Sequence, residues 1–216
     1  RKKILIPESA HGTNPASCSL NGYQSQSITA NDQGVLSLET VAKYFDADCA
    51  SIMITNPNTL GIFEPEIGNI AELVHSRGGY VYCDGANLNA LLGVVQPGKI
   101  GMDVMQINLH KTFTTPHGGG GPGLGALGVC QKLESFLPIP RIIQKGDSFE
   151  MSSAFPDSIG RVKSFFANFG MLIRAYAYIR ELAPEGLRRI AEMAVLNANY
   201  IRKGLEKIYH LTYPDP

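Results

Sequence analysis

Short apolar runs with few charges recur along the first 130 residues, and they constrain the fold more than any other feature. They lie at 49–55 (CASIMIT), 79–83 (GYVYC), 104–109 (VMQINL) and 124–130 (LGALGVC). The first two are almost continuously apolar, which is typical of strands that are buried on both faces of a parallel sheet. The runs therefore predict a sheet of mainly parallel strands.

A helical pattern separates the first two of these runs. Between 66 and 77, apolar side chains recur at i, i+3, i+4 and i+7, and Gly78-Gly79 ends the pattern. A shorter helix is expected at 38–45, with Ser37 as its N-cap. Strand, helix and strand in this order form a βαβ unit, which is normally right-handed, so the sequence predicts an α/β fold.

The character of the sequence changes after about residue 135. Three prolines, Pro138, Pro140 and Pro156, interrupt a stretch that is expected to be irregular. A long helix is expected over 159–182, and Pro184 fits the first turn of a second helix that runs to about 208. We therefore predict an α/β domain over 1–140, a linker over 141–158 and the helical start of a second domain over 159–216.

The ends of the sequence indicate a fragment of a longer polypeptide. There is no initiator Met, and a strand-like run begins at once, at 3–6. The last residues, YPDP, follow the final predicted helix without any capping element.

Composition excludes several functional classes. Nineteen basic residues balance nineteen acidic ones, so net charge gives no reason to expect nucleic acid or an anionic membrane as partner. No apolar run approaches the roughly 20 residues that span a bilayer, and the first apolar stretch is too short for a signal peptide. The four cysteines form no C-x-x-C pair, so we expect buried thiols rather than zinc ligands or disulfides.

Three polar residues follow three successive apolar runs. Asn56, Asp84 and Lys111 are separated by 28 and 27 residues. Each has an ordinary explanation, as a turn residue, a helix cap and a surface lysine. Parallel strands would nevertheless bring all three to one rim, where α/β sheets bind ligands. Pyridoxal phosphate (PLP) requires such a set: a carboxylate for its ring nitrogen, an amide for its phenolic oxygen and a partly desolvated lysine for its aldehyde.

A glycine-rich loop follows the lysine. Residues 115–123 (TPHGGGGPG) contain a formal G-x-G-x-x-G match, but the run follows a polar loop, contains Pro122 and leads into a strand. A dinucleotide fingerprint opens a helix instead, so we reject that interpretation. We prefer a loop that approaches a ligand closely, with a flexible connector as the alternative. His110 and His117 lack a carboxylate to complete a ligand set, so no metal is expected.

Five motifs in order resemble one family. HGTNPAS (11–17), TNPNTLG (55–61), DGANLNA (84–90), NLHKTF (108–113) and TPHGGGGPG (115–123) are similar to the glycine decarboxylase P-protein of the glycine cleavage system. The similarity continues through SIGRV (158–162), NFG (168–170) and RAYAYIRELAPEGLRR (174–189). It corresponds to the lysine-bearing half, or to the second subunit where the protein is split. The resemblance implies the PLP-dependent fold type I, with the large-domain portion followed by the helical start of the small C-terminal domain.

The resemblance also implies roles for individual residues. Lys111 would hold PLP covalently as the catalytic residue, Asp84 would keep the ring nitrogen protonated, and Asn56 would bind the O3′ oxygen. Further cofactor contacts are expected from Ala86 against the ring face, from His110 near the phosphate or the covalent bond, and from Thr13 and Asn14. A substrate channel that admits a lipoyl arm is expected along His117, Gly118, Gly119, Gly120 and Gly121.

The expected activity is that of glycine dehydrogenase (aminomethyl-transferring, decarboxylating), an oxidoreductase of glycine catabolism. Glycine would lose CO2, and the aminomethyl group would pass to the lipoyl arm of H-protein. A dimer or a heterotetramer with the other P-protein half is expected, in the bacterial cytoplasm or the mitochondrial matrix. The alternatives are another fold type I decarboxylase or lyase, and a non-catalytic scaffold module. In this family the phosphate cup precedes HGTNPAS, so we expect the isolated chain to be inactive.

Overall fold

The computed structural model describes residues 1–213 and is built around a six-stranded sheet in the order β2-β1-β3-β4-β5-β6. The first five strands in chain order pair in parallel and the last one is antiparallel. Their bounds are β1 (Lys3–Pro7), β2 (Gln24–Ile28), β3 (Cys49–Thr55), β4 (Tyr80–Asp84), β5 (Val104–Asn108) and β6 (Gly125–Val129). The predicted mainly parallel sheet is confirmed, and each predicted strand lies within one residue of its expected bounds.

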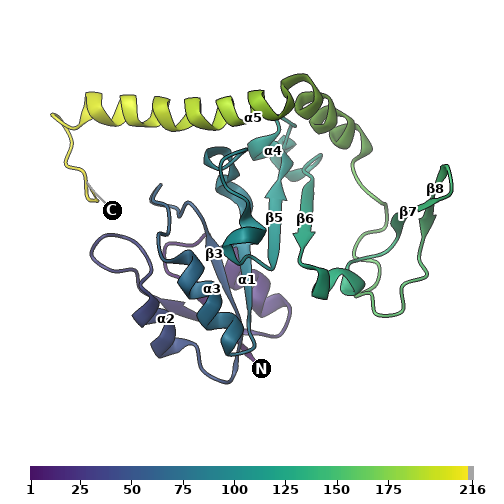
Figure 1. Ribbon diagram of the computed structural model, residues 1–216, viewed down its shortest axis with the longest axis horizontal. Coiled ribbons are helices and arrows are strands. Elements are labelled where there is room, and N and C mark those ends of the chain that lie inside the picture. The colour runs from purple at the N-terminus through teal and green to yellow at the C-terminus, as the bar shows by residue number, and fades with distance from the viewer. Residues whose placement is uncertain (214–216) are drawn as a thin grey trace.

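Helices cover both faces of this sheet. They are α1 (Thr13–Leu20), α2 (Leu38–Tyr44) and α3 (Ile67–Ser76). Figure 1 shows α2 and α3 in front of the strands and α1 behind them. The larger core lies on the α2–α3 side, whereas a small cluster of Ile6, Cys18 and Met53 lies under α1. The central strands of the sheet are therefore covered on both faces.

Two of these helices follow from local sequence signals. Ser37 accepts a hydrogen bond from the Thr40 N–H, which confirms the predicted N-cap of α2. In α3 the four residues of the apolar pattern are the buried ones: Ile67, Ile70, Ala71 and Val74. The sequence did not predict α1 or β2, because TNPASCSL and QSQSI lack an apolar period and β2 lies at the edge of the sheet.

Short helical turns connect the longer elements. They are η1 (Gly85–Ala90), η2 (Pro97–Ile100), α4 (Leu109–Thr112), η3 (Gly118–Gly120) and η4 (Gln131–Phe136). Two of them, η1 and α4, follow β4 and β5 directly, so they continue the chain above the rim of the sheet.

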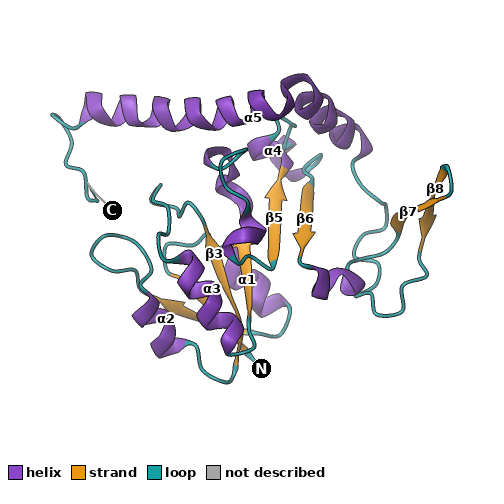
Figure 2. Ribbon diagram, in the orientation of Figure 1, coloured by secondary structure: helices purple, strands orange, loops and turns teal. Residues whose placement is uncertain are grey.

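The predicted linker over 141–158 is only partly irregular. It contains an antiparallel pair, β7 (Arg141–Lys145) and β8 (Ser148–Ser152), beside the main body (Figure 2). Gly146 closes the turn between them at a φ of 61°, which favours glycine. The prolines that suggested irregular structure lie outside this hairpin, so they do not interrupt its two strands.

The final helix, α5 (Phe169–Leu205), begins ten residues later than predicted. Gly160 has a φ of 91°, which a right-handed helix cannot include, so the expectation of a helix from 159 was wrong. The predicted break before Pro184 is confirmed, because Ala183 leaves helical geometry with a φ of 54°. The domain bounds at 140 and 158 stay predictions, and residues 214–216 of the last predicted segment lie outside the described residues.

Helix α5 crosses above the carboxyl ends of the strands (Figure 1). It is tied to the loop after α4, since the Arg174 Nε donates to the Thr114 carbonyl at 3.0 Å and the Asn168 Nδ2 to the Gly123 carbonyl at 3.1 Å. Within residues 1–213, no helix combines the length and apolar character that crossing a membrane requires.

The close pairing of β4 and β5 leaves no room for a side chain at Gly85. A Cβ added at Gly85, next to Asp84, would lie 2.2 Å from the Gln106 carbonyl oxygen of β5. We expect Gly85→Ala to lower the free energy of unfolding by about 1–3 kcal/mol, because the backbone must move apart. Gly98→Ala is the matched control, since a Cβ there meets nothing within 4 Å. Equal urea unfolding midpoints for the two variants would contradict this packing.

Candidate functional site

The carboxyl ends of three neighbouring parallel strands form the rim of the candidate site. Asn56 follows β3, Asp84 is the last residue of β4, and Lys111 lies in α4 immediately after β5. Thr55 is paired with Asp84, and Asp84 with Gln106, so the three strand ends are in register. The predicted placement of Asn56, Asp84 and Lys111 on one rim is confirmed.

The Asp84 carboxylate is buried, and the groups of the described chain that hold it are neutral. It is 8% exposed. Its Oδ1 accepts the Ala86 N–H at 3.0 Å, and its Oδ2 accepts the Asn14 amide at 3.4 Å. Among residues 1–213, no ion pair includes this carboxylate. A buried negative charge without a cation is costly, so the geometry suits a cationic ligand group.

Asn56 presents an unused donor at the same rim. Its side chain is 1% exposed, and its Oδ1 accepts the Glu64 N–H at 3.1 Å. Its Nδ2 has no hydrogen-bond partner within the described part of the chain. Buried donors are nearly always paired in native proteins, so this N–H group is available to an acceptor on a ligand.

Lys111 is exposed, so the expected partial desolvation of this lysine is wrong for the structure as described. In α4 the buried residues are Leu109 and Thr112, three positions apart on one side of the turn. Lys111 therefore lies on the outer side. Its backbone carbonyl accepts the Asn89 amide at 3.2 Å, which ties α4 to η1.

More polar atoms without partners gather around these residues. The described chain offers no hydrogen-bond partner to the buried Thr55 Oγ1, His110 Nδ1, Thr112 Oγ1 and Thr115 Oγ1. Sequence reasoning missed Thr112 and Thr115 as site residues. The available signal was the concentration of hydroxyl groups beside the lysine in KTFTTP, and two of these threonines, Thr112 and Thr115, are buried.

The two histidines of this region lie against each other. The ring centroids of His110 and His117 are 4.5 Å apart, in an edge contact of 63°. Burial lowers the pKa of His110 below its ordinary value, and the charges of His117 and Lys111 lower it further, which favours the neutral imidazole. Among residues 1–213, no group of three His, Cys, Asp or Glu side chains is arranged to hold a metal.

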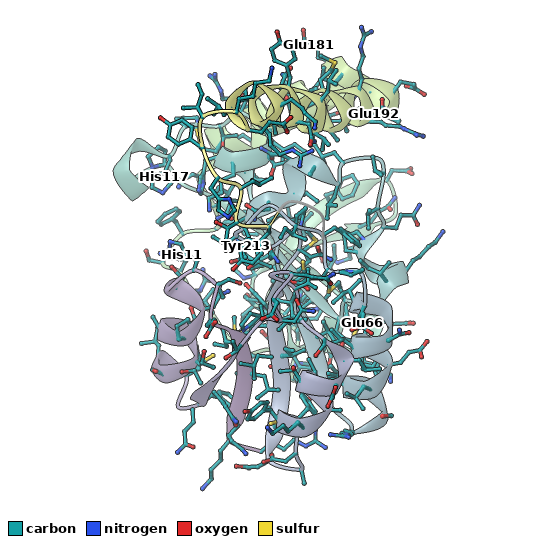
Figure 3. The ribbon with its side chains drawn as sticks, turned by 90° about the vertical axis from the view of Figure 1, so that its left-hand side faces the viewer. His11, Glu66, His117, Glu181, Glu192 and Tyr213 are labelled. Atoms are coloured by element: carbon teal, nitrogen blue, oxygen red, sulfur yellow. The ribbon has the colours of Figure 1, made fainter. Side chains whose placement is uncertain are left out.

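The glycine loop after His117 is exposed, and its backbone requires glycine. Gly118, Gly119 and Gly120 have φ values of 57°, 67° and 107°, which other residues rarely adopt. Figure 3 places His117 above His11 on one side of the molecule, with Glu66 on the opposite side. The loop therefore lies toward the α1 side of the rim. Its proposed use as a channel stays a prediction.

The remaining predicted residues differ in their placement. Asn14 is buried and joins the rim through Asp84. Thr13, at the start of α1, is exposed, and its N–H group donates to the His11 Nδ1 at 3.1 Å. Ala86 is half-buried and lines a cavity of about 370 Å³ between η1, the loop after β3 and α5. No contact tests the predicted cofactor roles of Thr13 and Ala86.

Glu64 is the main polar residue that sequence reasoning missed. It is 2% exposed, its Oε1 accepts the Asn58 amide at 2.9 Å, and its Oε2 accepts the Leu36 N–H at 2.8 Å. Burial raises its pKa above the usual value. One glutamate in the loop IFEPE carries no period or motif that distinguishes it from a surface residue.

Comparisons with known proteins agree on one family. The model of the aminotransferase class-V family matches residues 1–146. The chain is 53% identical over 216 residues to the probable glycine dehydrogenase (decarboxylating) subunit 2 of Chlorobium chlorochromatii, and 50% identical over 214 residues to the protein of that name in Oceanobacillus iheyensis. It is fully covered in the first match and 99% covered in the second, but spans only 45% and 44% of those proteins.

Solved structures share the fold. The whole chain matches a crystal structure of glycine decarboxylase (P-protein) of the glycine cleavage system, in inhibitor-bound form, with a TM-score of 0.80 at 21% identity. The match spans 51% of that protein. A sphingosine-1-phosphate lyase from Burkholderia pseudomallei matches 96% of the chain with a TM-score of 0.71 at 15% identity and is covered to 47%. These similarities and the sheet confirm the predicted fold class.

The raised pKa of Glu64 predicts a pH-dependent stability. The native chain keeps this proton to a higher pH than the unfolded chain, in which the pKa of a Glu is about 4.3. The stabilising contribution is therefore complete below that pH and is lost as pH rises through the native pKa. We expect the stability of the wild type relative to Glu64→Gln to fall as pH rises from about 4 toward neutral. Urea unfolding across this pH range measures the difference in unfolding free energy, with the exposed Glu72→Gln as control. A difference between wild type and Glu64→Gln that does not change with pH would contradict the raised pKa of Glu64.

Proposed function

The chain belongs to the aminotransferase class-V family, and we propose that the full-length protein is a PLP-dependent glycine dehydrogenase (decarboxylating). Two relatives with that name are at least 50% identical over nearly all of this chain, which supports the proposal. The observation that carries it is the rim on which three adjacent strand ends place Asn56, Asp84 and Lys111. Because the chain spans under half of those relatives, the activity is proposed for the full-length protein.

The rim residues fit PLP. When bound, PLP supplies an aldehyde for an amine and a protonated ring that withdraws electrons from the carbon losing CO2. The buried Asp84 carboxylate, which has no cation partner in residues 1–213, would hold the proton at the ring nitrogen. The Ala86 N–H and the Asn14 amide fix the orientation of that carboxylate, because each binds a different oxygen.

The other side chains have complementary tasks. The unpaired Asn56 Nδ2 would donate to the phenolic oxygen. The Lys111 amine would bind the aldehyde, and its position after β5 puts it beside the strand that carries Asp84. His110 immediately precedes Lys111, and because its neutral form is favoured it adds no second positive charge beside this amine. Thr13 and Ala86 complete the proposed cofactor site.

We propose that glycine is the substrate and that the lipoyl arm of H-protein receives the aminomethyl group. The exposed loop of Gly118–Gly121 beside His117 has no side chains to obstruct a thin arm, which supports an entry route there. We further propose a dimer or a heterotetramer with the related subunit. The apolar side chains exposed along α5, such as Phe169, Tyr200 and Ile201, support burial in such an assembly.

The first test removes the proposed cofactor amine. We expect Lys111→Ala in the full-length protein to abolish PLP- and H-protein-dependent exchange of CO2 between glycine and bicarbonate, because alanine offers no amine for the aldehyde. Lys132→Ala, at an exposed position after β6, is the matched control and should leave exchange unchanged. Near-normal exchange by Lys111→Ala without added amine would disprove the role of this lysine.

The second test removes the charge proposed to hold the proton at the ring nitrogen. We expect Asp84→Asn to keep PLP binding but to slow exchange by about 100-fold or more, because a neutral amide cannot hold the ring proton by charge. Asparagine keeps nearly the same shape, so binding should suffer less than rate. If binding were lost while the bound fraction reacted at the normal rate, Asp84 would have a structural role instead.

A further inference from the structure

Glu64 is a buried acidic residue outside the machinery described so far, and it lies directly behind Asn56. It belongs to the loop that joins β3 to α3. Its N–H group donates to the Asn56 Oδ1 at 3.1 Å. Both side chains are almost completely buried, at 2% and 1% exposure. Within residues 1–213, the Glu64 N–H is the one hydrogen-bond partner of the Asn56 side-chain amide.

The Glu64 carboxylate fixes the position of its own backbone. One oxygen accepts the Leu36 N–H and the other accepts the Asn58 amide. Asn58 in turn donates to the Gly34 carbonyl at 2.8 Å and accepts the Ile62 N–H at 3.1 Å. The loop after β3 is thus bound to the segment before α2 by hydrogen bonds that converge on one carboxylate.

Within the described residues, 1–213, the Glu64 carboxylate has no counter-charge. The groups that face it from its own loop and from the segment before α2 are neutral donors, and no ion pair among residues 1–213 includes it. A buried carboxylate without a cation costs stability, although each donor offsets part of that cost. Stability alone is therefore a poor reason for a glutamate at this position.

The orientation of the Asn56 amide provides a better reason. An asparagine side chain has an acceptor end and a donor end of nearly the same shape, and only its hydrogen bonds decide which end faces which way. With the Glu64 N–H on Oδ1, the Nδ2 must face the other direction and stays unpaired. A displaced Glu64 N–H would allow the amide to turn and to present an oxygen at the rim.

We propose that Glu64 is a positioning residue of the PLP site, which holds the Asn56 amide with its donor end toward the phenolic oxygen of the cofactor. This inference rests on the proposed function. A hydrogen bond donated to that oxygen stabilises its ionised form and lowers the pH at which the bound cofactor loses its proton. The turned amide would bring two oxygens together and would raise that pH.

Replacement of Glu64 by glutamine tests the role, because the side chain keeps its size but loses one acceptor. The new Nε2 would face either the Leu36 N–H or the Asn58 Nδ2, and both are donors. Loss of the negative charge alone would favour the deprotonated cofactor and would lower the pH at which bound PLP loses its proton. Loss of the Asn56 orientation would raise that pH, so the sign of the shift separates the two effects.

The experiment is a pH titration of the visible absorbance of PLP bound to the full-length protein. We expect Glu64→Gln to raise the midpoint by about half a pH unit or more, in the direction of Asn56→Ala. The double variant should show no rise beyond that of Asn56→Ala alone, because both changes remove the same hydrogen bond. The exposed Glu72→Gln is the matched control, and Asp84, His110 and Lys111 are unchanged throughout.

Several results would overturn the inference. An unchanged or lower midpoint in Glu64→Gln, with only a loss of thermal stability, would show that Glu64 supports the loop without orienting Asn56. A further rise in the double variant would show that the two residues act separately. If Glu64→Gln does not fold, Glu64→Asp, which keeps the charge but withdraws both acceptors by one methylene, must give the same sign. Failure of the wild-type protein to take up PLP would instead refute the proposed function itself.

Discussion

The parallel pairing of β3, β4 and β5 is the constraint on which the rest of the site depends. It brings Asn56, Asp84 and Lys111 to one rim although 55 residues separate the first from the last. The strands are held by buried apolar side chains on the α2–α3 side of the sheet. Because Gly85 admits no Cβ against β5, the carboxylate before it is placed by the backbone of two strands as well as by its own hydrogen bonds.

The polar groups at this rim are less completely satisfied than those behind it. Behind the rim, Glu64 and Asn58 bind each other and the neighbouring backbone. At the rim, the Asn56 Nδ2 and the Thr112 Oγ1 have no partner within the described residues, and Asp84 has only neutral ones. Such a contrast is expected where unpaired polar groups bind a ligand. PLP has the matching groups, a protonated ring nitrogen as the cation and a phenolic oxygen as the acceptor.

Much of this arrangement could be predicted from the sequence, because apolar runs and helical periods report burial directly. These signals did not predict α1 and β2, because both segments are polar. The hairpin of β7 and β8 was missed because the prolines on either side of it suggested irregular structure. Motif order located Asp84 and Lys111, but not the exposure of the lysine, which depends on which side of α4 is buried. Glu64 was beyond prediction, since only the folded loop brings its N–H group to Asn56.

If Lys111 holds PLP in the full-length protein, chemical labelling will locate the cofactor on this residue. Borohydride reduction of the PLP-loaded protein fixes the cofactor to the amine that binds it, and peptide mass mapping then locates the label. We expect a single modified peptide, labelled at Lys111, and we expect this label to be absent when the protein is unfolded in urea before PLP is added. A label on another lysine such as Lys99 or Lys132, or no label on a protein that binds PLP, would contradict it.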